Sequence, residues 1–141
     1  MITRGFLFME KFIELHIPIL TVSEANCSEH WTAKNKRHQK QKLMVKGHLL
    51  RNGTSIPLPC HVKLTRVSPR TLDIGDNLPS AFKWIKDAIA DHINPERTIG
   101  ISKKTGRKVK IAGRSDDDER ITWEYDQEKG KPQSIKIDIF A

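Results

Sequence analysis

Hydrophobic and polar residues alternate in four stretches of the chain, and a period of two residues is typical of β-strands with one buried face. In the first stretch, Ile13, Leu15 and Ile17 share one face. The turn Lys129-Gly130-Lys131-Pro132 separates the last two stretches, so we predict that these two strands form a hairpin. The four predicted strands cover residues 11–17, 57–67, 121–126 and 135–139.

Two further stretches have helical features. In the second of them, apolar residues recur every three or four positions and form one stripe. Asp76 or Asn77 is the predicted N-cap, Pro79 suits the first turn, and Asn94-Pro95 ends the helix. The stripe consists of Leu78, Ala81, Phe82, Ile85, Ala88 and Ile89.

The earlier helical stretch, residues 30–51, has few apolar residues and a nearly all-polar middle. Ser28 is a suitable N-cap, and Asn52-Gly53 is a suitable end. We therefore predict a helix that faces solvent or a ligand along its centre and is anchored through its ends.

Together these elements predict an α+β domain with the order β-α-β-α-β-β, in which two main helices pack on one face of a small mixed sheet. Residues 96–115 show no periodicity and are rich in Lys, Arg and Gly, so we predict a basic loop there. Residues 1–9 are predicted to be an N-terminal extension, because their apolar run is too short for a signal peptide. Residues 10–141 then form a single domain.

Composition adds a preference for an anionic partner, because the net charge is +8. Nucleic acid is the first candidate, and a membrane surface is disfavoured because the chain has no long apolar run. Cys27 and Cys60 lack the spacing of a zinc site or of a disulfide framework. We expect two buried thiols in a reducing, cytoplasmic environment.

The positive charge is concentrated in one part of the chain, because no acidic residue occurs between Glu29 and Asp73. A run of charge is usually only a solvated face. Here the like charges have no acid beside them in sequence, which is mildly destabilising unless a polyanion compensates it. We predict nucleic-acid contacts from this run and from the basic loop, specifically from Lys34, Lys36, Arg37, Lys40, Lys42, Arg70, Lys104 and Arg107.

Two acidic clusters stand out against this basic background, residues 72–78 and residues 115–119. Crowded carboxylates repel one another unless a cation lies between them, and Mg²⁺ is bound by a few carboxylates together with substrate phosphates. The alternative is ordinary capping at Asp76 and a polar turn before a strand. The combination suggests a metal-dependent enzyme that acts on a phosphate polyanion.

With both clusters in view, the chain resembles the RusA-type Holliday-junction resolvases, which are common in phages and prophages. Leu72-Asp73 with Asp76-Asn77-Leu78 is similar to the aspartate motif of this family, and the helix that follows is similar as well. The resemblance covers most of the chain through further segments: His30-Trp31 with the basic run, Val67-Ser68-Pro69-Arg70, residues 82–91, Asp116-Asp117-Asp118, Arg120-Ile121, Trp123, Tyr125, Gln127, Lys129 and Gly130.

The resemblance implies a homodimeric, Mg²⁺-dependent endonuclease that cuts four-way DNA junctions in recombination and repair. It implies that Asp73 and Asp76 are catalytic metal ligands and that the second cluster supplies a third. We favour Asp118 as the third ligand, because its distance to Ile121 matches best, with Asp116 as the alternate. The competing hypotheses are a non-catalytic DNA-binding protein and a nuclease that acts on other branched DNA.

This chain departs from the family pattern in two places. Ile74-Gly75 lengthens the gap between the first two aspartates by one residue, which a turn or bulge at the glycine would absorb. A family lysine four residues beyond the second aspartate is replaced by Ser80. Lys83, two helical turns beyond Asp76, is the predicted catalytic substitute, and Lys86 is the alternative.

Overall fold

The structure is a computed structural model, and it describes residues 9–24, 30–53, 55–73, 75, 77–93, 97–101, 103–111 and 119–141. The predicted N-terminal extension therefore lies outside the described residues, apart from Met9. The elements are β1 (Lys11–Ile17), α2 (Trp31–Asn52), β2 (Cys60–Ser68), α3 (Asn77–Ala81), α4 (Lys83–Ile93), β3 (Arg97–Ile101), β4 (Lys108–Ile111), β5 (Ile121–Lys129) and β6 (Ser134–Phe140).

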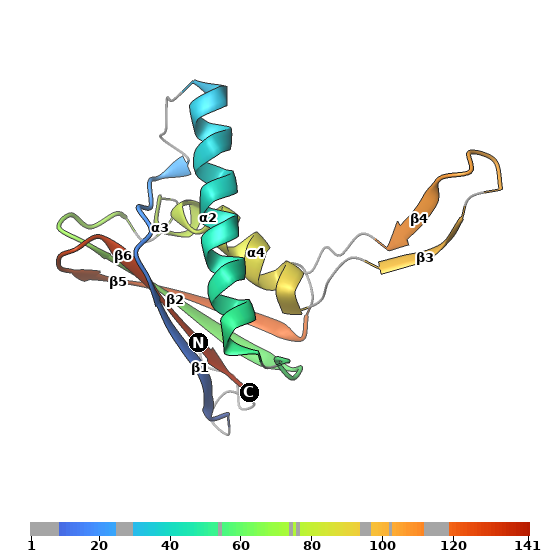
Figure 1. The fold of residues 1–141 in the computed structure, drawn as a ribbon. Helices are drawn as coiled ribbons and strands as arrows, with labels where there is room; N and C mark the ends of the chain where they lie inside the picture. The colour runs from blue at the N-terminus through green and yellow to red at the C-terminus, as the bar shows by residue number, and fades with distance from the viewer. Residues whose placement is uncertain are drawn as a thin grey trace.

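Four strands form the main sheet in the order β1-β6-β2-β5, in which β2 is parallel to β5 and antiparallel to β6 (Figure 1). The predicted hairpin of the last two strands is wrong, because β2 lies between them. The link between β5 and β6 passes the end of β2, where the Gly130 N–H donates to the Ser68 carbonyl at 3.1 Å. Because β2 is buried along most of its length, its backbone N–H and C=O groups need partners, which β5 and β6 supply at its two edges.

The helices α2 and α4 pack on one face of this sheet, which confirms the predicted α+β class (Figure 1). Val45 and Leu49 are the fully buried contacts of α2, so this polar helix is anchored near its C-terminal end. There Gly53 adopts a left-handed φ of 67°, and its N–H donates to the Leu50 carbonyl at 3.1 Å. The remaining core residues come from α3, α4, all four strands of the main sheet and the segments that flank these elements, and they include the isoleucines 135, 137 and 139 of β6.

The helix predicted after the first acidic cluster is divided into α3 and α4 at Phe82. The Phe82 side chain is fully buried and stacks on Tyr125 of β5, with the ring centroids 5.9 Å apart. Its carbonyl accepts from the Lys86 N–H at 2.7 Å and so begins the ladder of α4. Leu78 before the break and Ile85 and Ile89 after it are nevertheless buried in the same core.

The basic segment 96–115 was predicted to be a loop, and this was wrong for residues 97–101 and 108–111. Strands β3 and β4 pair as an antiparallel ribbon, with Arg97 opposite Ile111 and Ile101 opposite Lys108. The segment contains β-branched residues that favour strands, and Gly106 supplies a left-handed φ of 66° near the turn. The short strands and the shift in register near Gly100 leave no alternation to detect in the sequence.

No helix in the described part of the chain combines the length and the apolar character that crossing a membrane requires.

The central position of β2 predicts the cost of truncating its buried side chains. Leu64 is fully buried, so Leu64→Ala is expected to lower the free energy of unfolding by about 3 kcal/mol. Lys63→Ala, on the opposite face, removes only surface ion pairs and is expected to cost less than about 1 kcal/mol. Urea denaturation followed by circular dichroism measures both values. Equal losses for the two variants would contradict the assigned register.

Candidate functional site

The first acidic cluster lies where the chain leaves β2 and enters α3. The Gln127 side chain of β5 holds the backbone of Leu72 from both sides: its Oε1 accepts from the Leu72 N–H at 2.8 Å, and its Nε2 donates to the Leu72 carbonyl at 2.6 Å. The Leu78 N–H then donates to the Asp73 carbonyl at 3.0 Å. The backbone around Asp73 is thus fixed on both sides, while its side chain is exposed.

Hydrogen bonds orient the Asp73 carboxylate. The Asn77 side-chain amide donates to Asp73 Oδ1, and the Ser23 hydroxyl donates to the Asn77 side-chain oxygen. Asp73 is thus an exposed carboxylate whose orientation Asn77 fixes, and carboxylate oxygens are the type of ligand that Mg²⁺ prefers.

The second acidic cluster cannot be placed beside Asp73 from the described residues. Asp116 and Asp118 lie outside them, as does Asp76. Arg120, which follows the second cluster, has its carbonyl 2.9 Å from the Cys60 N–H, at the start of the parallel β2–β5 pair. Gln127, beside Leu72, is seven residues further along the chain, or about 23 Å away along β5.

The described residues therefore do not show the two acidic clusters side by side. Within the part of the chain that the structure describes, no three His, Cys, Asp or Glu side chains are placed to hold a metal ion together. Asp73 fits one position in a magnesium site. A shared site with Asp76 and Asp118 stays a prediction.

Ser23 and Glu24, two consecutive residues, connect the Asp73 junction to the basic helix α2. Ser23 supports Asn77, as described above, and the Glu24 carboxylate is bound by both Arg37 and His38 of α2. Arg37 donates through both terminal nitrogens, with Nη2 to Oε2 at 3.2 Å, and His38 Nε2 is also 3.2 Å from Oε2.

Burial is the largest influence on the pKa of Glu24 and acts to raise it. The hydrogen bonds and charges of Arg37 and His38 together outweigh burial, so the pKa lies below its ordinary value. Glu24 is therefore a carboxylate that its cationic partners keep ionised. It fixes the side of α2 that faces the Asp73 junction.

The expectation that the basic run lacks acidic partners is wrong for three of its members. Arg37 is bound by Glu24, Lys46 pairs with Asp91 at 3.0 Å, and Lys63 pairs with Glu124 and Asp126. These carboxylates lie outside the run in sequence, and the fold brings them back to it. Arg37 thus has a structural role that was not predicted.

Two of the predicted lysines lie beside Trp84 of α4. The His38 ring stacks on the indole with centroids 4.1 Å apart, and the ammonium groups of Lys42 and Lys83 lie 5.0 and 5.1 Å from the ring centroid. These distances are within the range of cation–π attraction. Lys83 was predicted to share a helical face with Asp76, and because Asp76 lies outside the described residues this stays a prediction. In the structure, Lys83 and Lys42 lie over the same indole ring.

The other predicted nucleic-acid contacts are accessible. Lys36 and Lys40 are exposed on α2, and Lys34 is half-buried. Arg70 is exposed after β2, where its carbonyl accepts from the Arg66 side chain at 2.6 Å. Lys104 and Arg107 are exposed near the turn of the β3–β4 ribbon.

Sequence reasoning missed Ser23, Glu24 and the role of Gln127. Gln127 belonged to the segments that carry the family resemblance, so its position was available but its backbone contacts were not. Residues 19–28 look like an ordinary polar connection. The one signal there is that Glu24 is among the last acids before the basic run.

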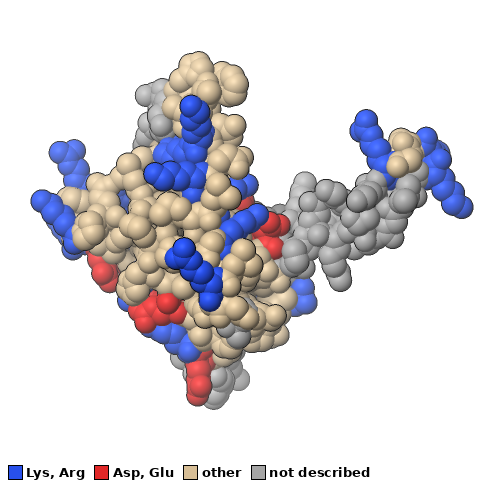
Figure 2. All heavy atoms as spheres, in the orientation of Figure 1, with Lys and Arg blue, Asp and Glu red and all other residues tan. Residues whose placement is uncertain are grey.

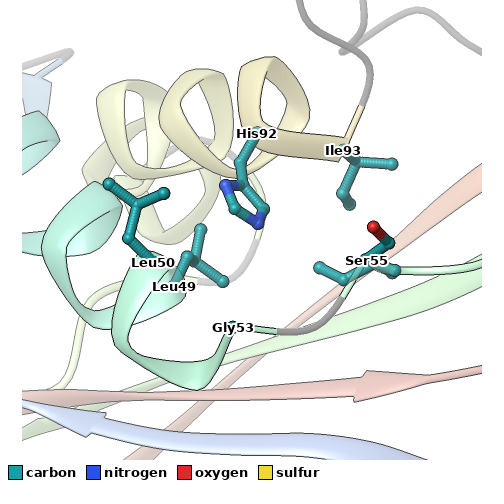
Figure 3. Close-up of a pocket in the computed structure, with 7 residues that line it drawn as sticks. Leu49, Leu50, Gly53, Ser55, His92 and Ile93 are labelled. Atoms are coloured by element: carbon teal, nitrogen blue, oxygen red, sulfur yellow. The ribbon is translucent and has the colours of Figure 1, made fainter.

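A hollow of about 390 Å³ lies between the C-terminal ends of α2 and α4 (Figure 3). Figure 3 shows the His92 ring directed between the two helices, near Leu49 and Gly53. Burial lowers the pKa of His92, Lys46 lowers it further, and Asp91 opposes them. The described lining residues are mainly apolar and include no carboxylate, so they do not make this hollow the candidate catalytic site.

Comparison with known proteins gives no relative for this chain, because no family model, no curated protein and no solved structure matches it.

The Glu24 ion pair predicts a specific loss of stability. Glu24→Gln leaves the largely buried Arg37 charge without its carboxylate and is expected to cost about 3 kcal/mol at neutral pH. Because the pKa of Glu24 is lowered, its contribution is present above pH 4.5 and is lost as the pH falls through the folded-state value. The difference between wild type and variant in urea denaturation should therefore shrink in acid. Glu128→Gln, at an exposed position on β5, is the matched control.

His92 is expected to make the stability depend on pH as well, in this case because burial on folding weakens the binding of a proton to a base. Its pKa is lowered from 6.5 by folding, so the unfolded chain binds more protons as the pH falls through and below 6.5, and stability decreases there. His92→Gln is expected to flatten the dependence of the melting temperature on pH in this window. Calorimetry between pH 5 and 7.5 measures it. Superimposable pH profiles for the two proteins would refute this assignment.

Proposed function

We propose that this protein is a Mg²⁺-dependent, structure-specific endonuclease that cuts branched DNA, with four-way junctions as its main substrate. The observation that carries the proposal is the connection through Ser23 and Glu24. It places an oriented aspartate at a strand–helix junction and a basic helix in one hydrogen-bonded network. Carboxylate and cation together are what phosphodiester hydrolysis on a polyanion requires.

The distribution of charge supports DNA on the helical side of the molecule. Helix α2 carries seven Lys or Arg residues and no acidic residue. On the sheet face turned away from the helices, carboxylates including Glu14 and Glu124 pair with the lysines beside them. Figure 2 shows Lys and Arg along α2, whereas Asp and Glu appear mainly over the strands. A polyanion is therefore attracted more strongly to the first surface than to the second.

The roles of the residues follow from this placement. Asp73, held by Asn77, and Asp76 and Asp118 would hold the metal. A bound Mg²⁺ would polarise a phosphoryl oxygen and lower the pKa of a bound water. Lys42 and Lys83, positioned around Trp84, would bind phosphates of the strand near the site. Lys36 and Lys40 would follow the backbone along α2. None of these contacts reads bases, so the specificity would be for branched shape.

A two-fold homodimer suits this substrate, because it presents two identical sites to two opposed strands. The resemblance to RusA-type resolvases supports the dimer and the reaction. Two other functions are compatible with the same basic surface. A non-catalytic DNA-binding protein predicts binding without cutting in Mg²⁺, and a nuclease for other branched DNA predicts flaps cut faster than junctions.

The decisive variant is Asp73→Asn. It keeps the size of the side chain and removes the charge, so cutting of a synthetic four-way junction in Mg²⁺ should fall by roughly a hundredfold or more, with junction binding retained. Asp91→Asn, which removes only a surface pair with Lys46, is the matched control and should cut normally. Cleavage of labelled junction, flap and linear duplex is measured with and without Mg²⁺. Undiminished cutting by Asp73→Asn would exclude Asp73 from the chemistry.

Mixing variants tests how the second acidic cluster joins the site, since Arg120 and Leu72 lie at opposite ends of the β2–β5 pair. Asp118→Asn alone should lose cutting as Asp73→Asn does. If each site is built within one protomer, mixed dimers of the two variants stay inactive. If a site combines Asp73 of one protomer with Asp118 of its partner, each mixed dimer regains one intact site.

A further inference from the structure

The β3–β4 ribbon, residues 97–111, extends away from the sheet and the helices (Figure 1). Its strands pair with each other, and in the described part of the chain neither pairs with a strand of the main sheet. A lone two-stranded ribbon is only marginally stable in water. An element of this kind, held out from the body, is suited to contact a partner.

The chemistry of the ribbon indicates the kind of partner. Residues 97–111 contain six Lys or Arg residues and no Asp or Glu. Near the turn, Lys103, Lys104 and Arg107 are all exposed, and Figure 2 shows Lys and Arg gathered at the far end of the ribbon. Such an uncompensated cluster on a narrow support matches a polyanion rather than an apolar surface.

The shape of the ribbon favours double-stranded DNA over a single strand as the partner. The major groove of B-form DNA is about 12 Å wide and admits a two-stranded β-ribbon. A strand of five residues is about 17 Å long, enough to reach across a groove from a body that rests on the adjacent backbone. A single strand of DNA has no groove and offers the ribbon only scattered phosphates.

We propose that the β3–β4 ribbon is a duplex-binding arm that lies in a groove of the DNA, away from the cutting site. The inference rests on the proposed function only for the identity of DNA as the ligand. Lys103, Lys104 and Arg107 contact phosphates on the two sides of the groove. The arm gives the protein affinity for a DNA arm of the junction and takes no part in hydrolysis.

The experiment compares Lys104→Gln/Arg107→Gln with a control that removes the same charge elsewhere. The control is Lys63→Gln/Lys136→Gln, on the sheet face turned away from the helices, where both lysines pair with carboxylates. The binding of a fluorescent 30-base-pair duplex, and of a single strand of the same length, is measured by anisotropy in EDTA over a series of KCl concentrations.

For the ribbon variant, duplex affinity should fall by about tenfold, and the slope of log K against log salt should fall by about two, one for each lost phosphate contact. Affinity for the single strand should change by less than about twofold, and the control should behave as wild type. An unchanged duplex slope, or an equal loss for duplex and single strand, overturns the proposal.

Failure of this inference is distinguishable from failure of the proposed function, because binding in EDTA does not depend on cutting. At saturating protein concentration, the ribbon variant should cut a four-way junction in Mg²⁺ at the wild-type rate. A duplex-binding defect in a protein that never cuts would preserve the ribbon as a DNA arm and reject the nuclease. Normal cutting with normal duplex binding would preserve the nuclease and reject the ribbon as a DNA arm.

Discussion

The ion pair between Glu24 and Arg37, shared with His38, is the interaction on which the candidate site depends. Both side chains are largely shielded from water, so their attraction is much stronger than that of a surface pair. The same carboxylate fixes His38, which stacks on Trp84 and so positions the neighbouring lysines. Through Ser23, the adjacent residue, it also supports the hydrogen bond that orients Asp73. One partly buried acid thus organises both halves of the site.

The elements of the main sheet and its helices could be predicted from periodicity, whereas their arrangement could not. Alternation in residues 11–17 reveals which face is buried, and β1 has those bounds. Alternation carries no information about which strand lies alongside. The insertion of β2 between β5 and β6 depends on long-range pairing, and a short turn such as residues 129–132 suggests a hairpin even when another strand separates its arms.

The candidate site could be predicted in its residue types and only partly in its geometry. Asp73 lies at a strand–helix junction, as its position before a capped helix indicated. The neighbours of Arg37 and Lys83 could not be predicted, because Glu24 and Trp84 reach them only after the chain folds back. Counting charges along the sequence overstated how many cations of the basic run lack an acidic partner. Within the described residues, much of the charge that is left for a ligand lies on the outer side of α2 and at the ribbon turn.

The position of β6 has a consequence for how the protein is made. Strand β1 pairs only with β6 in the main sheet, and β2 uses β6 as one of its two neighbours. While the ribosome is still adding residues before 134, β1 has no strand to join and one edge of β2 stays open. An open edge is a site for association with other chains. The sheet is therefore completed only when residues 134–140 have emerged, and the nascent protein depends on its polar surfaces or on chaperones until then.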